Sequence, residues 1–396
     1  MPSFASIVPL IGGETIAMEN VFGKRPEYIL SYEGFENNDR QLLEYYKNEV
    51  PYHLIKDNQL PDVNNVDVVN TVCPCAGLSS LSPSSNSESA TNDWMRTSAE
   101  HVLGTLSPKV FWGENAPRLA SKMGEPVVKD LREIGEKYGY TFSIFKTKSI
   151  LHGLSQVRDR AFYFFWKGNR VPVFEYINRT HQTIEDAIRS VKRNANDPMD
   201  ILANEATPSE NPYYKYTLHR TGKTHQEFQQ SIDKTTNPLE WIYKNDSLLK
   251  AAEWMDMAGH EREAAKCRRK HDKLASGGNI MWHNIEIPKD YIGAFVGHRP
   301  TSLTHPDEDR FLTIRECLTL MKMPNDFILQ GGRKNLNHIC QNVPVTTAQD
   351  MADHVLRFVE GRLDNQLIET DYLVQDNKNQ TYEYNKSSLQ LDEFMV

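Results

Sequence analysis

The sequence predicts an α/β fold built on a doubly wound, mostly parallel sheet. Over the first 175 residues, short apolar runs alternate with helix-like segments, the order that produces strand–helix–strand units. The run VDVVNTV at residues 66–72 is β-branched and nearly continuous, as expected of a strand covered on both faces. At 396 residues the chain is long enough to bury the core of one large or two medium domains.

The expected elements follow one another along this first part. A glycine turn at Gly12 and Gly13 separates the first strand from a helix that ends near residue 22. A second helix is expected at residues 38–48, because Asn37 and Asn38 provide a polar start. The expected strands are residues 6–10, 28–32, 66–72, 109–112, 140–146 and 161–166.

Ligands of such sheets bind where parallel strands end at their carboxyl edge. Cys75 and Glu114 each lie just past the end of an expected strand. The chemistry of this protein is therefore expected around these two side chains.

Residues 178–299 differ in composition and pattern from the first 175 residues: they are polar and lack the strand–helix alternation. A long helical pattern is expected at residues 237–274, and its end at 260–273 carries six Lys or Arg against three acids. This charge run, with Arg268, Arg269 and Lys270, is either a solvated helix face or a patch that contacts phosphates. Helices are expected again at residues 313–321 and 347–360, followed by a polar tail at 366–396 without a readable motif.

Composition excludes several classes of protein. The formal net charge of -8 means that any surface for nucleic acid must be a local patch. No apolar stretch approaches the roughly 20 residues that span a bilayer, and the N-terminus lacks the positive start of a signal peptide. Five cysteines without regular spacing indicate reduced thiols in a cytoplasmic compartment. No second CxxC or HxxxH accompanies Cys73 and Cys75, so a metal site is not expected there.

The segment around Cys75 carries the most specific signal. Pro74-Cys75, followed by Gly77-Leu78-Ser79, resembles the catalytic loop of the DNA cytosine-5 methyltransferases. Further segments resemble that family in its order: Glu114-Asn115-Ala116, Gln156-Val157-Arg158-Asp159-Arg160, residues 310–316 with 323–327, and Val343-Pro344. The resemblance covers about residues 1–175 and 300–360, and it implies a Rossmann-like, S-adenosylmethionine-dependent methyltransferase fold.

The resemblance implies a role for each of these side chains. Cys75 is expected to add as a thiolate to carbon 6 of cytosine, and Cys73 to serve only in packing. Glu114 is expected to donate a proton to N3, although a helix N-terminal carboxylate is an alternative. Arg158 and Arg160, spaced by two, are expected on one face, holding O2 of the base and ordering the loop. An exposed sheet face is the alternative for the two arginines.

The target base must leave the duplex stack to be reached. The serine-rich residues 79–97, beginning at Ser79, are expected to close over the flipped base, although such composition also suits a linker. Gln156 is a further expected DNA contact.

The resemblance also implies the residues that bind the methyl donor, S-adenosylmethionine. The turn Leu10-Ile11-Gly12-Gly13 is expected to carry it, with Glu36 on the ribose and Asp57 on the adenine amino group. The remaining expected contacts are Pro74, Gln341 and Asn342. Alternatively, Glu36 and Asp57 are surface carboxylates that bind no donor.

Several positions depart from the family pattern. Val8 replaces a Phe and Leu10 replaces the first Gly of the cofactor turn, and Ala76 replaces a common Gln beside the nucleophile. Because a side chain restricts φ, the loop at Leu10 is expected to run differently from a glycine loop. In the closing segment, Cys340 and Gln341 stand where the family has Gly and Asn. A donor that carries a group other than methyl therefore stays open as an alternative.

We therefore predict a DNA cytosine-5 methyltransferase that acts on double-stranded DNA, as a monomer without metal, in the cytoplasm of a prokaryotic or phage-type host. Residues 1–177 and 300–365 form the predicted catalytic domain, and residues 178–299 form a divergent target-recognition domain that enters the major groove. The alternatives are a tRNA-modifying member of the family and a catalytically silent nucleic-acid-binding relative.

Overall fold

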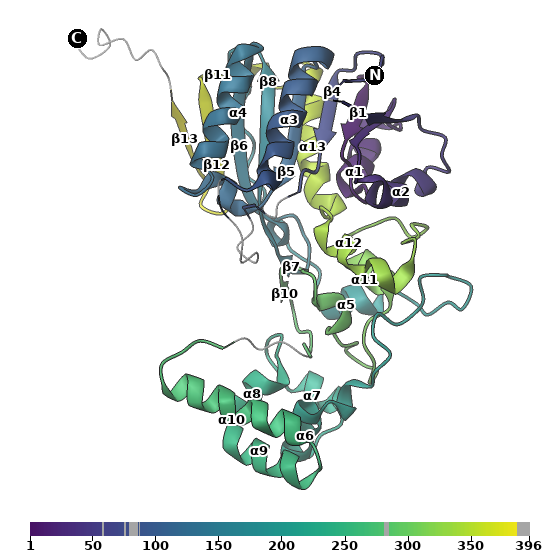
Figure 1. The fold of residues 1–396 in the computed structure, drawn as a ribbon, viewed down its shortest axis with the longest axis vertical. Helices are drawn as coiled ribbons and strands as arrows, with labels where there is room; N and C mark the ends of the chain where they lie inside the picture. The colour runs from purple at the N-terminus through teal and green to yellow at the C-terminus, as the bar shows by residue number, and fades with distance from the viewer. Residues whose placement is uncertain (58, 75–76, 79–85, 87, 281–284, 386–396) are drawn as a thin grey trace, which may run out of the picture.

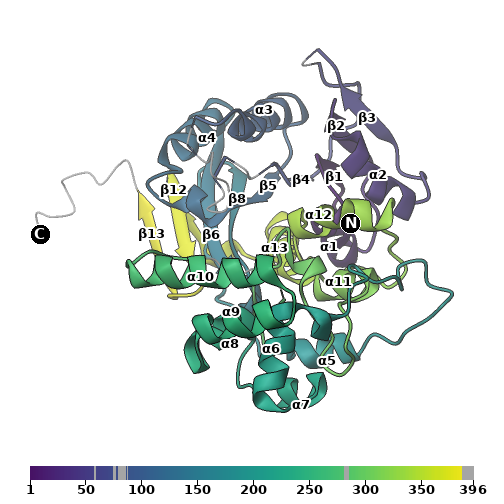
Figure 2. The ribbon, with the colours of Figure 1, turned by 60° about the horizontal axis from the view of Figure 1, so that its bottom comes forward.

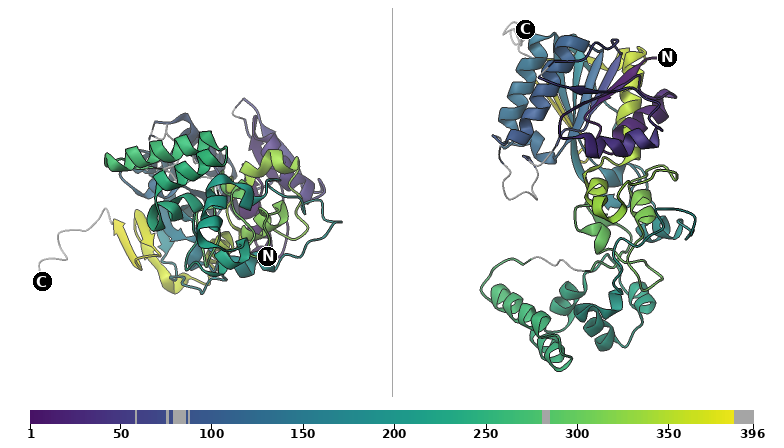
Figure 3. Two further views of the ribbon diagram at one scale, coloured as in Figure 1. Left: turned by 90° about the horizontal axis from the view of Figure 1, so that it is seen from below. Right: turned by 45° about the vertical axis from the view of Figure 1, so that its right-hand side comes forward.

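The computed structural model describes residues 1–57, 59–74, 77–78, 86, 88–280 and 285–385. A region built on a large sheet lies at one end of the molecule and a helical region at the other, joined by a narrower middle part (Figure 1 and Figure 3). The N-terminus lies at the end of the sheet region that points away from the helices, so β1 runs toward the helical region.

The central sheet has nine strands within the described part of the chain, in the order β13-β12-β6-β8-β5-β4-β1-β2-β3. Strand β8 is antiparallel to β5 and β6, β13 is antiparallel to β12, and the other neighbours are parallel, which confirms the predicted mostly parallel sheet. The strands are β1 (Phe4–Ile7), β2 (Ile29–Tyr32), β3 (Tyr52–Ile55), β4 (Val68–Thr71), β5 (Val110–Asn115), β6 (Tyr140–Lys148), β8 (Asp159–Lys167), β12 (Tyr372–Asp376) and β13 (Thr381–Asn385).

Helices cover both faces of this sheet, as a doubly wound fold requires (Figure 2). Helices α1 (Gly13–Phe22) and α13 (Val345–Val359) pack together on one face, and α3 (Asp93–His101) and α4 (Glu125–Lys137) on the other. The helix α2 (Glu36–Tyr45) follows β2. Large buried rings fill the middle of the sheet, where Trp112 of β5 stacks on Phe164 of β8.

The described part of the helical region contains five consecutive helices, of which the first and the last three share a small core and the second packs in a neighbouring cluster. They are α6 (Pro212–Thr221), α7 (His225–Gln230), α8 (Pro238–Asn245), α9 (Leu248–Met257) and α10 (Glu261–Ala275). The single long helix expected at residues 237–274 is therefore wrong, because three separate helices form there. Ser247 caps the start of α9 by accepting hydrogen bonds from the backbone N–H of Leu249 and Lys250. Gly259, at φ 79°, turns the chain between α9 and α10.

The middle part joins the two ends through short elements. Strand β7 (Gln156–Val157) pairs in parallel with β10 (Ile292–Gly293), so the chain before β8 meets the chain that returns from the helical region. The neighbouring helices are α5 (Ile184–Arg189), α11 (Ile314–Leu320) and α12 (Leu336–Gln341).

Residues 367–385 differ from the polar tail expected there. Strand β11 (Leu367–Glu369) pairs with β9 (Arg170–Pro172), and β12 extends the central sheet alongside β6. The side chain of Gln375 bonds both the N–H and the carbonyl of Phe174, at 2.8 and 3.1 Å. Polar side chains of this strand form hydrogen bonds inside the sheet. The hydropathy of the sequence therefore did not indicate a buried strand here.

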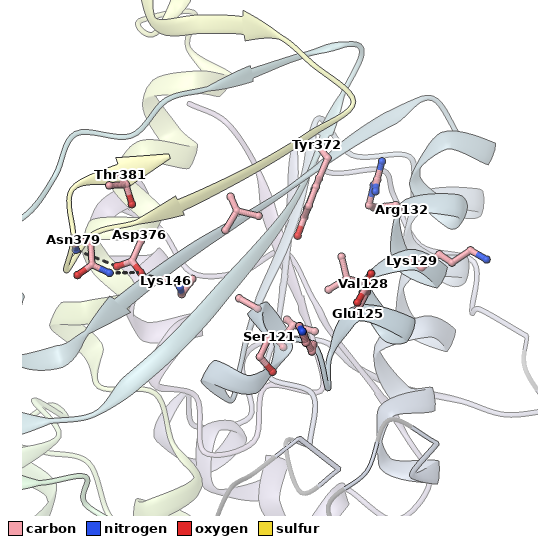
Figure 4. Close-up of a pocket in the computed structure, with 14 residues that line it drawn as sticks. Ser121, Glu125, Val128, Lys129, Arg132, Lys146, Tyr372, Asp376, Asn379 and Thr381 are labelled. Carbon is pink, nitrogen blue, oxygen red and sulfur yellow. Dashed lines mark hydrogen bonds and ion pairs between the residues drawn. The ribbon is translucent and has the colours of Figure 1, made fainter. Parts of the chain in front are cut away.

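The added strands leave a hollow of about 800 Å³ between α4 and β12 (Figure 4). Arg132 of α4 lies over the ring of Tyr372, and Lys146 forms an ion pair with Asp376 at 2.8 Å. Neither the glycine turn nor Glu114 lines this hollow, so it is separate from the site expected at the other strands.

Candidate active site

The segment that carries the expected nucleophile leaves the carboxyl end of β4. Cys75, Ala76 and Ser79 lie outside the described residues. The neighbouring Cys73 is buried, with its Sγ 3.4 Å from Oγ1 of Thr71 and 3.8 Å from Oγ of Ser98. Burial raises the pKa of the Cys73 thiol, which disfavours the reactive thiolate. These contacts support the packing role expected for Cys73.

Glu114 lies near the carboxyl end of β5 and is only 2% exposed. Its carboxylate forms an ion pair with the guanidinium of Arg160, which comes from the neighbouring strand β8. The structure therefore brings together two of the side chains that the sequence analysis had placed in one site. A buried carboxyl at a strand end, held by one arginine, is suited to exchange a proton with a bound base.

Arg158 lies between β7 and β8 and is 1% exposed. Its Nη1 donates to the carbonyl oxygens of Phe295 and Cys340, at 3.1 and 3.0 Å, and its Nη2 donates to that of Asn342 at 3.0 Å. In this structure Arg158 thus ties the closing segment at 340–342 to the chain that returns from the helical region.

Gln156 is buried beside this clamp. Its Nε2 donates to the carbonyl of Leu320 at 3.2 Å, and its Oε1 accepts from the N–H of Phe295 at 3.3 Å. Both ends of the amide therefore bond to protein backbone and hold the junction between the sheet and the helical region.

The glycine turn after β1 is fully buried. Gly12 has φ 92°, and both Val8 and Leu10 adopt positive φ, at 51° and 53°. The expectation that Leu10 departs from a glycine conformation is therefore wrong. The surrounding packing holds these side-chain residues in the left-handed region, at a cost on the order of 1–3 kcal/mol each.

The closing segment packs directly on this turn. The N–H of Gly13 donates to Oδ1 of Asn342 at 2.9 Å, and a Cβ on Gly13 would lie 2.1 Å from the carbonyl oxygen of Val343. Only glycine fits this close approach. Asn342 is buried, whereas the side chain of Gln341 is exposed.

Three acids lie at the carboxyl ends of β2 and β3. Asp57 is exposed in the turn after β3. Glu36 is exposed in the first turn of α2, and its Oε2 accepts the N–H of Gly34 at 2.6 Å. Glu33 directly follows the last residue of β2 and is exposed. The sequence analysis missed Glu33, although a spacing of about 20 residues from the glycine turn is the signal for a ribose-binding acid.

Glu14 is a second residue that the sequence analysis missed. It lies in the first turn of α1 and is 0% exposed. Burial raises the pKa of Glu14 well above its usual range, and the nearby Glu114 raises it further, whereas the amide of Asn70 lowers it. An acid directly after a double glycine, at the start of a buried helix, is the sequence signal for this residue.

The basic end of α10 is only partly available to a ligand. Arg268 forms an ion pair with Asp256 of α9, and Arg269 is exposed. Lys270 is half-buried, and burial lowers its pKa. Ala264 and Cys267 form the buried face of the helix.

Two kinds of feature are absent from the part of the chain that the structure describes. None of its helices has both the length and the apolar surface needed to cross a membrane. No group of three or more His, Cys, Asp or Glu side chains among these residues is arranged to hold a metal ion.

A family model described as C-5 cytosine-specific DNA methylase matches residues 3–357. DNA (cytosine-5)-methyltransferase 1B of Oryza sativa subsp. japonica is 23% identical over 334 residues, which cover 69% of this chain and 20% of that protein. Type II methyltransferase M.FnuDI of Fusobacterium nucleatum is 30% identical over 99 residues, which cover 24% of this chain and 29% of that protein. The matched part is thus less than a third of the length of either curated relative.

Solved structures share the fold. A prophage-encoded E. coli protein described as a DNA modification methyltransferase has a TM-score of 0.58 at 13% identity, covering 92% of this chain and 100% of that one. The Entamoeba histolytica methyltransferase EhMeth has a TM-score of 0.52 at 12% identity, covering 91% and 99%. At these identities the likeness extends to the fold alone.

Proposed function

Because the chain belongs to the C-5 cytosine-specific DNA methylase family, we propose that it transfers a methyl group to carbon 5 of cytosine in double-stranded DNA. The observation that carries this proposal is the buried Glu114–Arg160 pair at the end of β5, the strand beside β4. Cys75 follows β4 in the sequence, and a nucleophile and an acid brought to one base suit addition to its ring.

Carbon 5 of cytosine is too weak a nucleophile to react directly. The Cys75 thiolate forms a bond to carbon 6, and Glu114 gives a proton to N3, so that electron density moves to carbon 5. Carbon 5 then takes the methyl group. Water takes the proton from carbon 5, the Cys75 thiolate is eliminated from carbon 6, and N3 returns its proton to Glu114, which restores the aromatic ring, the free cysteine and the acid. The base must first flip out of the duplex, because carbon 6 is inaccessible in the stack.

The residues at the ends of β1, β2 and β3 fit a nucleoside donor. Exposed carboxylates follow β2 and β3, where they can accept hydrogen bonds from ribose hydroxyls and an adenine amino group. Glu33 is better placed for the ribose than Glu36, whose carboxylate already accepts the N–H of Gly34. S-adenosylmethionine supplies an electrophilic methyl group when bound there, and Gly12, Gly13 and Asn342 form the base of the site.

The helical segment at 178–299 is the proposed recognition region. It joins the sheet region through β7–β10 and the Arg158 clamp, next to the catalytic residues. In α10, Arg269 is the better candidate for a phosphate contact, because Arg268 is held by Asp256.

Purified protein incubated with labelled S-adenosylmethionine, duplex DNA and tRNA tests this function. We expect label in DNA only, and mass spectrometry of the released nucleosides should show 5-methylcytosine. Cys75→Ser and Glu114→Gln should abolish labelling, whereas Cys73→Ser, the matched control, should retain it. Label in tRNA, or a base that carries a different group, would replace the proposal with one of the alternatives above.

A further inference from the structure

The reaction proposed above gives no role to residues 367–385, which contain β11, β12 and β13. The match to the family model ends at residue 357, so these strands lie beyond it. Strands β12 and β13 form one edge of the central sheet (Figure 1), and β11 pairs with β9. Residues 173–179, the exit chain, follow β9 and lead toward the helical region. The strands at 367–385 therefore lie where they can act on the connection between the two ends of the molecule.

Two side-chain amides beyond the family match bind the backbone of the exit chain. Gln375 bonds both the N–H and the carbonyl of Phe174. Asn377 is 2% exposed; its Oδ1 accepts the N–H of Ile177 at 2.7 Å, and its Nδ2 donates to the carbonyl of Ile177 at 3.0 Å. The same Nδ2 donates to Oγ1 of Thr147 in β6 at 2.9 Å. Because both N–H bonds and the oxygen of this amide are used, Asn377 fixes the exit chain to the central sheet.

The exit chain is held again at Arg179. Its Nη2 forms an ion pair with Oδ1 of Asp350 in α13 at 2.6 Å. Oδ2 of Asp350 lies 2.7 Å from Nδ1 of the buried His152, and Nε2 of His152 lies 2.7 Å from Oγ1 of Thr147. The Thr147 hydroxyl therefore links this group of contacts to the one at Asn377.

The residues just after the exit chain bind the chain that returns from the helical region. Asp290 receives these contacts: its Oδ1 lies 2.9 Å from Nε2 of His181, and its carbonyl accepts the N–H of Ile184 at 2.7 Å. The N–H of Asp290 donates to Oε2 of Glu185 at 2.6 Å. The returning chain then pairs with β7 through β10. Both connections to the helical region are thus joined, so a shift of the exit chain moves them together.

We propose that Asn377 is a positioning residue for target recognition, because through Ile177 it sets the direction in which the chain enters the helical region. The inference rests on the proposed function, in which the segment at 178–299 contacts DNA. A protein that populates its binding-competent arrangement only in part binds more weakly in proportion to that fraction. The side chain of Asn377 bonds to Ile177 and Thr147 and not to the catalytic pair, so DNA that is bound correctly should react at the wild-type rate.

The test is the methylation kinetics of Asn377→Ala on a duplex that carries a site methylated by wild type. We expect KM for this duplex to rise about tenfold while kcat stays within about twofold, because about one molecule in ten then holds the competent arrangement. A purely structural role would reduce the amount of folded enzyme, which lowers the apparent kcat at an unchanged KM. The matched control is Asn379→Ala, two residues along the same turn, whose exposed side chain donates to Asp376; it should keep both wild-type values. An unchanged KM in Asn377→Ala overturns the inference.

A second variant serves if Asn377→Ala folds poorly. Thr147→Val keeps the shape of the side chain but removes the oxygen that accepts the Asn377 amide. KM for the duplex should then rise about threefold, as the loss of one hydrogen bond predicts, and an unchanged KM in the folded variant contradicts the inference.

Direct binding separates this inference from the proposed function. The dissociation constant of the same duplex, measured by fluorescence anisotropy without methyl donor, should rise about tenfold in Asn377→Ala. If wild-type reactions contain no 5-methylcytosine but the two dissociation constants differ in this way, the proposed function fails and the role of Asn377 stands. If wild type is active and the dissociation constants are equal, the role of Asn377 alone fails.

Discussion

Replacement of Arg158 by alanine tests the structural core of the site. Its guanidinium donates to three buried backbone carbonyls, which belong to Phe295, Cys340 and Asn342. A hydrogen bond to a charged donor contributes about 1.5–3 kcal/mol, and a buried carbonyl left without a partner costs about 1–3 kcal/mol. Because water and relaxation recover part of a three-bond loss, we expect Arg158→Ala to lower the free energy of unfolding by about 4 kcal/mol.

Urea unfolding followed by tryptophan fluorescence measures this effect, because Trp112 and Trp166 are buried in the sheet. Arg158→Lys keeps the charge but cannot span three carbonyls, so about half of the loss should remain. The control is Arg25→Ala, which removes an exposed ion pair with Glu49 and should cost less than about 1 kcal/mol. If the free energy of unfolding of Arg158→Ala lies within about 1 kcal/mol of the wild-type value, Arg158 does not stabilise this junction as proposed.

Three further outcomes follow from single contacts. Burial raises the pKa of Asp39 to about 7, so the folded state holds a proton that the unfolded chain loses near pH 4, and stability falls as pH rises between these values. Asp39→Asn should remove about 4 kcal/mol of that decline, seen as a smaller fall in the free energy of unfolding from pH 4 to 7 than in wild type. Arg269→Ala should lower the slope of the logarithm of the DNA-binding constant against the logarithm of salt concentration by about one counterion. Arg268→Ala should lower this slope less, because Arg268 is paired with Asp256. Equal slopes for the two variants would contradict the Arg268–Asp256 pairing. Cys73→Ala should retain methyl transfer and lose about 1–2 kcal/mol of stability by thermal melting, and loss of activity in the folded variant would show that Cys73 does more than pack.

The parts of the fold that could be predicted are those with a strong local pattern. The apolar runs at β4 and β5 are buried on both faces, so composition alone identified them. Strand β3 was missed because its sequence, YHLI, is half-buried at the sheet edge. Strand β12 was missed because its buried Gln375 bonds to the chain at Phe174, a partner about 200 residues away.

The sequence did not predict those features of the site that depend on tertiary packing. A residue with a side chain was not expected at positive φ, yet Leu10 adopts φ 53° in a fully packed turn. The ribose-binding role expected for Glu36 stays a prediction, and Glu33, which directly follows β2, is a second exposed acid at the same strand end. Nothing local to the first helix indicated that Glu14 would be fully buried, because its burial depends on how α1 packs against β4 and α13.

The central claim is that the sulfur of Cys75 bonds to the target base. Incubation with methyl donor and a duplex that carries 5-fluorocytosine at the target position should trap this bond. After methyl transfer, carbon 5 carries a fluorine in place of the proton that must be removed, so the thiolate cannot be eliminated. Peptide mapping by mass spectrometry should find the nucleotide on the peptide that contains Cys75, at that residue. A stable adduct at any other residue, or full transfer to cytosine by Cys75→Ser, would contradict the account.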